Sequence, residues 1–232
     1  TRRRVYFSFT PKSKFLSLFF KKSELFGSPL WLALFFLSYP FFYSLTLNII
    51  RQGIAFVFIV YAIDRRIYGA YIEAICWLAV AFLFHYASLF YLLAGLLIEF
   101  RIRLWFMLFI WVALSTLIMI TGSAYVIDTA SWFLNLTGWF PQYRTYVDAV
   151  GALEYETGFK LHWFLFSAIP ILIVAIAYKC GARLSTEGRY VLNLYIAILI
   201  IHVFLFGFAY SDRVAIMAWI LWPYIINPSA FT

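Results

Sequence analysis

The chain has 232 residues, of which 65% are hydrophobic, 23% are aromatic and only 12% are charged. Soluble domains carry about 25% charged residues, so this composition excludes an ordinary soluble protein. The net charge of +8 would suit nucleic acid, but basic residues also flank membrane spans on their cytoplasmic side. The second explanation fits the apolar composition better, and we expect no nucleic-acid partner.

Long apolar runs recur along the chain, without the alternation of polar and apolar residues that a transmembrane barrel requires. A helix needs about 20 apolar residues to cross a bilayer. The runs therefore predict an all-α, polytopic integral membrane protein with about eight helical segments. Some of these segments are short for a full crossing and would be tilted, broken or shielded by neighbours. The expected segments are 29–47, 49–63, 68–84, 86–100, 104–122, 161–178, 190–209 and 212–228.

Four regions follow from these segments. Residues 1–28 carry seven Lys and Arg among Phe and Leu, which is typical of an interfacial helix or of a basic connector. Helices one to five occupy 29–122, an extracytoplasmic loop occupies 123–160, and helices six to eight occupy 161–232. The chain begins with Thr rather than Met, and we expect it to be part of a longer protein.

Basic residues indicate the orientation in the membrane. With the N-terminal segment in the cytoplasm, 14 of the 18 Lys and Arg lie on the inner side, as the positive-inside rule requires. This count depends on a hairpin at HYASL, 85–89, because one continuous helix over 70–98 would invert the later helices and leave 12 inside. The larger bias favours the hairpin. On the inner side, acid–base pairs are expected among Glu73, Glu99, Arg66 and Arg103.

The loop at 123–160 is the longest polar connection, with four acidic and two basic residues. Long loops between short connections are usually functional or disordered. Its tryptophans and tyrosines argue against disorder and predict a capping element on the outer membrane surface.

The predicted topology brings the rare polar residues to the outer face. Ionisable groups at membrane depth are costly and are candidates for function. Several arginines on one face favour a polyanion site, because guanidinium groups match phosphate oxygens in bidentate pairs. Arg51 and Arg213 also begin helices, where backbone N–H groups add donors. The outer set is Asn48, Arg51, Gln52, His85, Tyr86, Arg144, Tyr146, Lys160, His162, Tyr210, Ser211, Asp212 and Arg213.

Each of these residues also has a purely structural explanation. Arg51 could anchor a helix end at the headgroups, and His85 could be an interfacial histidine. Asp212 fits the positive end of a helix, with Ser211 or Asp212 as the N-cap. His202 lies deeper in an aliphatic helix, where a structural role is expected. The outer face has no acid-rich metal motif, so neither a metal ion nor a cofactor is expected.

Three stretches resemble the EpsG-like family of Wzy-type exopolysaccharide and O-antigen polymerases. They are IIRQGIAFVFIVYAI, AVAFLFHYASLFYLLAGLL and YSDRVAIMAWILWP. The positions that carry the resemblance are Arg51–Gln52, Phe84–His85 and Asp212–Arg213, with the loop tyrosines of QYRTY. The match spans roughly residues 30–228, and the order and spacing of its motifs are more specific than any single motif.

The resemblance implies a GT-C-like glycosyltransferase in the bacterial cytoplasmic membrane, active on its extracytoplasmic face. It would join repeat units carried on undecaprenyl diphosphate. The implied partners are this lipid-linked substrate, membrane lipid and other polysaccharide-assembly proteins. The implied catalytic residues are His85 as general base, Asp212 as the second candidate for that role, and Arg51. The implied diphosphate ligands are Arg51, Gln52, Arg144 and Arg213. The implied sugar-contacting residues are Tyr146, Tyr143 and Trp139.

Three other functions stay open at this point. A transporter or flippase of a lipid-linked or anionic glycan would use the same arginines without forming a bond. A polysaccharide acyltransferase would also place histidine and arginine at the membrane surface. A non-catalytic subunit of a synthesis complex is the third alternative, and it would be favoured if changes of exposed surface charge left activity intact.

Overall fold

The computed structural model describes residues 50–100, 102–122, 158–206, 211–227 and 230–231. Within these ranges the regular structure is helical, apart from an isolated bridge between Leu184 and Phe231. The expected helix at 29–47 and the loop at 123–157 lie outside the described residues. The helices are α3 (Ile50–Ile67), α4 (Tyr71–Phe84), η3 (Tyr86–Ser88), α5 (Leu89–Glu99), α6 (Leu104–Thr121), α9 (Leu161–Lys179), α10 (Thr186–Phe204), α11 (Asp212–Trp219) and α12 (Trp222–Ile225).

The predicted break near residue 85 is confirmed. Helix α4 ends at Phe84, and His85 adopts an extended conformation with φ −153° and ψ 116°. The chain then makes one 3₁₀ turn and continues as α5. The stretch 70–98 is therefore two helices, as the distribution of basic residues favours.

The last predicted helix, 212–228, is wrong as a single element. Helix α11 ends at Trp219, and α12 begins at Trp222 with Pro223 in its first turn. Proline has no N–H, so Pro223 cannot donate to the carbonyl four residues earlier, and its ring disfavours continuous helix there. Tyr91 of α5 donates its hydroxyl to the carbonyl of Met217, at the end of α11. The break is thus held by a side chain from another helix.

Helix α10 begins four residues earlier than expected and ends before 209. Ser185 is its N-cap, and the Ser185 hydroxyl accepts the N–H of Gly188 at 3.0 Å. Helix α3 continues through Asp64, Arg65 and Arg66 to Ile67, beyond the apolar run from which its end was predicted.

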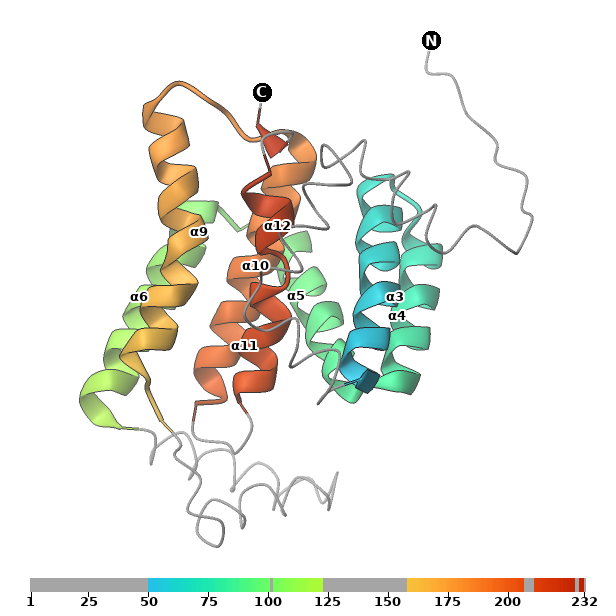
Figure 1. Ribbon diagram of the computed structural model, residues 1–232, viewed down its shortest axis with the longest axis horizontal. Coiled ribbons are helices and arrows are strands. Elements are labelled where there is room, and N and C mark those ends of the chain that lie inside the picture. Colours follow the sequence, from blue (N-terminus) through green and yellow to red (C-terminus); the bar gives the residue numbers. More distant parts are fainter. Residues whose placement is uncertain (1–49, 101, 123–157, 207–210, 228–229, 232) are drawn as a thin grey trace, which may run out of the picture.

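From α3 to α11 the described helices alternate in direction, apart from the short turn η3, so their ends collect at two levels (Figure 1). The start of α3, the break at residue 85, the end of α10 and the start of α11 share one level, which we call the site end. The end of α3, the start of α4, the end of α5 and the start of α10 share the other level, which we call the basic end. This arrangement separates Arg51 and Arg213 from most of the other basic residues that the structure describes.

Three of the described helices are long and apolar enough to cross a membrane: Leu104–Thr121, Leu161–Lys179 and Thr186–Phe204. Helices α4 and α5 are apolar but shorter. The two outer helices, α6 and α9, expose large apolar side chains such as Phe109 (63%) and Ile176 (61%). Such surfaces suit contact with lipid. The number of eight membrane segments stays a prediction.

Helix α10 forms the centre of the bundle. Its residues from Leu192 to Leu199 are buried apart from Asn193, and it contacts α3, α5, α6, α11 and α12. Because it is apolar on all sides, it requires neighbours on all sides.

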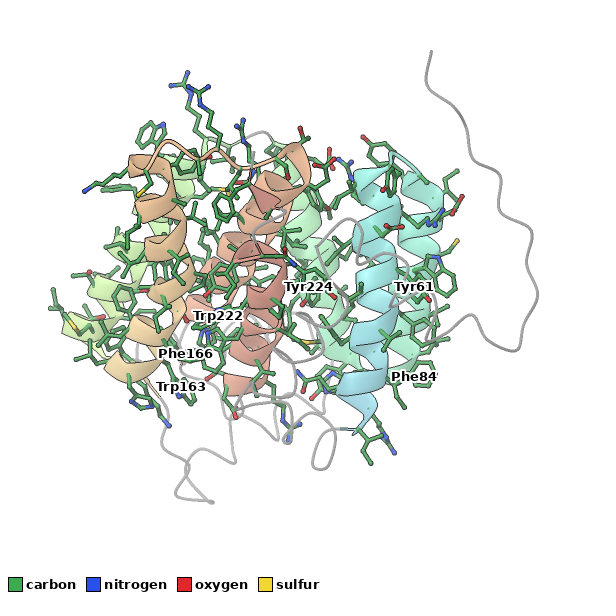
Figure 2. All side chains as sticks on the ribbon, turned by 45° about the horizontal axis from the view of Figure 1, so that its top comes forward. Tyr61, Phe84, Trp163, Phe166, Trp222 and Tyr224 are labelled. Atoms are coloured by element: carbon green, nitrogen blue, oxygen red, sulfur yellow. The ribbon has the colours of Figure 1, made fainter. Side chains whose placement is uncertain are left out.

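Hydrogen bonds between side chains join α9 and α10 to the broken helix. Trp219 Nε1 donates to Ser167 Oγ at 2.8 Å, and the Tyr195 hydroxyl donates to the Ser167 carbonyl at 2.7 Å. Trp222 Nε1 donates to the Tyr195 hydroxyl at 3.1 Å, and its ring stacks on Phe166 with centroids 4.3 Å apart (Figure 2). In an apolar environment such bonds replace those that water would make. They fix α11 relative to the rest of the bundle.

Ion pairs join helices at the basic end, as predicted for its acidic residues. Arg66 Nε donates to Glu99 Oε1 at 2.8 Å, which pairs α3 with α5. Glu73 pairs with Arg65, at 3.5 Å, rather than with Arg66 or Arg103. The Arg66 guanidinium also lies 4.1 Å from the ring centroid of Tyr71.

Candidate functional site

Residues from three separate parts of the sequence meet at the site end. Arg51 and Gln52 lie in the first turn of α3, His85 lies in the break after α4, and Asp212 and Arg213 begin α11. The Gln52 Nε2 atom donates to the Arg213 carbonyl at 3.1 Å across 161 residues of sequence. This bond joins the start of α3 to the start of α11, and α3 also contacts the 3₁₀ turn that follows His85.

Gln52 is fully buried, with 0% of its surface exposed. Its amide nitrogen contacts the backbone of α11, and its Oε1 atom has no hydrogen-bond donor among the described residues. The contact that the structure gives Gln52 is thus with the protein itself. It holds the start of α3 against the start of α11 and so sets Arg51 relative to Arg213. Direct binding of diphosphate by Gln52 stays a prediction.

His85 is held in place by its backbone and by its ring. Its N–H donates to the Ala81 carbonyl at 3.0 Å, and its own carbonyl accepts the N–H of Ser88 at 3.0 Å. The ring Nδ1 accepts the N–H of Ala87 at 3.1 Å. The ring also stacks on Tyr86 with centroids 5.0 Å apart. The residue is 8% exposed, so it is a structured part of the site rather than a solvated side chain.

The pKa of His85 reflects its burial and the charged residues near it. Burial, together with the positive charges of Arg213 and then Arg51, lowers the pKa of His85 from 6.5 to about 4. Removing an imidazolium from water is costly, and nearby cations increase that cost. His85 is therefore neutral at physiological pH, and both guanidinium groups lie close enough to influence it.

Helix α11 presents its N-terminus at the same place. Ser211 occupies the N-cap position, as predicted, but its side chain makes no capping hydrogen bond. Its carbonyl accepts the N–H groups of Val214 and Ala215 at 3.0 and 3.3 Å. Asp212 lies in the first turn, where the helix dipole stabilises negative charge. The same dipole adds to the positive potential that Arg51 and Arg213 produce.

A second cluster lies at the site end of α9 and α10. The Lys160 ammonium lies 4.6 Å from the ring centroid of Trp163, and Trp163 packs edge-on against Trp219 with centroids 6.1 Å apart. His202 is buried, with Phe206 and Trp163 against its ring. The structural role predicted for His202 fits this packing. His162 is exposed at the start of α9.

The remaining predicted site residues lie outside the described ranges. They are Trp139, Tyr143, Arg144 and Tyr146, with the neighbouring candidates Asn48 and Tyr210. Among the described residues, no group of three or more His, Cys, Asp and Glu could hold a metal ion.

Two contacts were not predicted from the sequence, one at the site and one at the far end of α11. The N–H of Ala87 at the His85 ring and the hydroxyl of Tyr91 at α11 both depend on the short break HYAS. Ala87 belongs to no motif, so the sequence did not indicate that its N–H would contact the His85 ring. The break between α4 and α5, by contrast, was predicted from the distribution of basic residues.

The apolar helices, with Arg51, His85 and Arg213 at the site end, define a helical membrane protein with a polar cluster at one end of its bundle. The chain belongs to the EpsG family: the model of that family matches residues 6–231, nearly the whole sequence. This confirms the resemblance carried by the RQ, FH and DR positions. Neither the curated proteins nor the solved structures include a significant match to this chain.

Proposed function

We propose that this protein is a polysaccharide polymerase that joins repeat units carried on undecaprenyl diphosphate. Membership of the EpsG family is consistent with such a role. The observation that carries the proposal is the meeting of Arg51, Arg213 and the neutral ring of His85, with Gln52 joining their helices. A diphosphate is the part of the substrate that such a cationic cluster suits.

The reaction transfers a glycosyl group. A hydroxyl oxygen of one repeat unit attacks the anomeric carbon of another, and the bond from that carbon to the diphosphate oxygen breaks. The electron pair leaves with the diphosphate, and the hydroxyl proton passes to a base, for which the sequence offers His85 and Asp212. Charge grows on the leaving oxygen, so fixed cations lower the barrier more than they stabilise the substrate. In this proposal guanidinium groups do this, without a metal ion.

The loop residues complete the proposed site. Arg144 would be a further phosphate ligand, and Trp139, Tyr143 and Tyr146 would contact sugar rings. Aromatic faces suit the apolar faces of sugars. The lipid tail would lie against apolar helices open to the bilayer, where α4 exposes Leu83 (82%) beside His85.

The proposed orientation puts the site end on the extracytoplasmic side of the bacterial cytoplasmic membrane. Arg65, Arg66 and Arg103 then face the cytoplasm at the basic end, together with Arg183 and Arg189. This agrees with the positive-inside rule. The repeat unit would be available on this face only after its lipid carrier has been flipped.

The test uses the purified protein in nanodiscs with the lipid-linked repeat unit of its host. Products are resolved on a gel, and binding of undecaprenyl diphosphate is measured in parallel. Arg51→Ala and Arg213→Ala each remove a charge-assisted hydrogen bond donor, and we expect each to weaken binding by about 10- to 100-fold. Arg103→Ala is the matched control, because it makes the same change in an exposed arginine at the basic end.

Loss of the polymer ladder in folded Arg51→Ala and Arg213→Ala, with a normal ladder in Arg103→Ala, would support the proposal. A full ladder in both site variants would refute this site. A donor that crosses the membrane without being lengthened would indicate a flippase instead. Product formation that requires an acyl donor would indicate an acyltransferase.

A further inference from the structure

The ring of His85 has a defined tautomer. A neutral imidazole carries one N–H and one acceptor nitrogen, and the hydrogen bond at one nitrogen decides which is which. Nδ1 of His85 accepts the N–H of Ala87 at 3.1 Å. The ring proton is therefore on Nε2, which makes the free edge of the ring a donor.

The local backbone keeps this arrangement in place. His85 ends α4 and at the same time caps the 3₁₀ turn Tyr86–Ser88. Turning the ring over would place Cδ2–H against the N–H of Ala87, and the other tautomer would place Nδ1–H there. Either change would leave the buried N–H of Ala87 without an acceptor. An unsatisfied buried donor costs about 1–3 kcal/mol, so the observed orientation is strongly preferred.

The charges around the ring disfavour a second proton. Arg51 approaches from α3 and Arg213 from α11, while Tyr86 stacks on the ring from its own segment. The ring thus stays neutral although it lies among cations. A neutral N–H beside two guanidinium groups adds a directed donor to an anion site without adding a third positive charge that would repel them.

We propose that His85 donates a hydrogen bond from Nε2 to a phosphate oxygen of the lipid-linked diphosphate, and that it does not act as the base. This inference rests on the proposed function. A base role would require Nε2 to accept, but that atom already carries the proton. The other nitrogen faces the N–H of Ala87. Asp212, in the first turn of α11, is then the remaining candidate for the base.

Two amide variants distinguish a hydrogen-bond donor from a base at position 85. His85→Asn places an amide oxygen near the position of Nδ1, where it can accept from Ala87, but it has no donor at the position of Nε2. His85→Gln can place an amide N–H near the position of Nε2, but it cannot act as a base. If His85 is a donor, His85→Asn weakens binding of undecaprenyl diphosphate about tenfold, and His85→Gln keeps it within about threefold. His162→Asn, at an exposed histidine of the site end, is the control.

The elongation assay provides the contrast. We expect His85→Gln to form a visible ladder and His85→Asn to form much less. Wild-type affinity for undecaprenyl diphosphate in both variants, with elongation abolished in both, would overturn the inference in favour of a base.

A second measurement does not depend on the reaction. The chain has only three histidines, so ¹⁵N-histidine spectra of the protein in nanodiscs can be assigned with His85→Asn and His162→Asn. We expect His85 as the neutral Nε2–H form between pH 5 and pH 8. A ring protonated on Nδ1, or one that titrates near its ordinary pKa, would overturn the inference. If Arg51→Ala and Arg213→Ala left undecaprenyl diphosphate binding intact, the proposed function would fail while the tautomer result stood.

Discussion

Replacing Gln52 by Met separates folding from function at the site. The two side chains have similar length and volume, so the change leaves little cavity. It removes the hydrogen bond from Nε2 to the Arg213 carbonyl, which contributes about 1 kcal/mol. It also removes the buried Oε1 atom, which has no donor within the described structure and costs about 1–3 kcal/mol to bury. The two effects oppose each other.

We therefore expect Gln52→Met to leave the free energy of unfolding unchanged or to raise it by up to about 2 kcal/mol. The thermal unfolding midpoint of the protein in detergent would stay the same or rise by up to about 4–8 °C. Affinity for undecaprenyl diphosphate would nevertheless fall about tenfold, because Arg213 loses the contact that sets its distance from Arg51. Gln52 would then lower the stability of the protein while it positions Arg213, as expected of a residue retained for function.

Tyr91→Phe is the matched comparison, because it also removes one hydrogen bond to a backbone carbonyl of α11. Tyr91→Phe removes no buried unpaired oxygen that would offset the lost hydrogen bond, and the carbonyl of Met217 lies at a helix end. We therefore expect Tyr91→Phe to lose more stability than Gln52→Met. Tyr91 contacts the far end of α11 and should leave diphosphate affinity nearly unchanged. The reasoning about Gln52 would be refuted by the opposite pattern, in which Gln52→Met lowers the midpoint more than Tyr91→Phe and binds diphosphate normally.

Three further predictions follow from contacts elsewhere. Ser167→Ala removes the bond from Trp219 Nε1 in the interior, and we expect it to lower the free energy of unfolding by about 1–3 kcal/mol. Trp219→Phe should cost more, because it also removes ring packing against Trp163 and Phe166, and the double variant should lose less than the sum of the two. Glu99→Gln breaks the pair with Arg66 while Glu99 is 46% exposed, so the loss measured by thermal unfolding should stay below about 1 kcal/mol and shrink at high salt. His85 takes up a proton below pH 6.5 when unfolded but only near pH 4 when folded, so stability should fall as the pH drops through that interval, and His85→Gln should reduce the fall.

The helices were largely predictable because apolar runs and basic connections constrain a membrane protein strongly. The hairpin at His85 followed from charge alone, although no Gly or Pro marks it. The break after Trp219 was missed because the apolar run continues through it, and only Pro223 indicates it. The end of α3 at Ile67 lies beyond the predicted end at 63, because the helix keeps its backbone hydrogen bonds through charged residues at the membrane boundary.

The site was predictable as a gathering of residues but not as a geometry. The topology was sufficient to bring Arg51, His85 and Arg213 to one face. The bond from Gln52 to Arg213 joins positions 161 residues apart, and no local pattern contains it. The orientation of the His85 ring depends on one backbone N–H of an alanine, which every residue except proline would offer equally.

The exposed end of α4 has a kinetic consequence for the proposed reaction. Leu83 and Phe84, with exposed fractions of 82% and 40%, directly precede His85, and Phe84 lies at the end of its helix (Figure 2). A carrier lipid can therefore reach the cations by moving sideways within the bilayer, with its tail still in hydrocarbon. Encounter then occurs in two dimensions, and the rate should follow the mole fraction of carrier in the membrane. Diluting the nanodiscs in buffer at constant lipid composition should leave that rate unchanged.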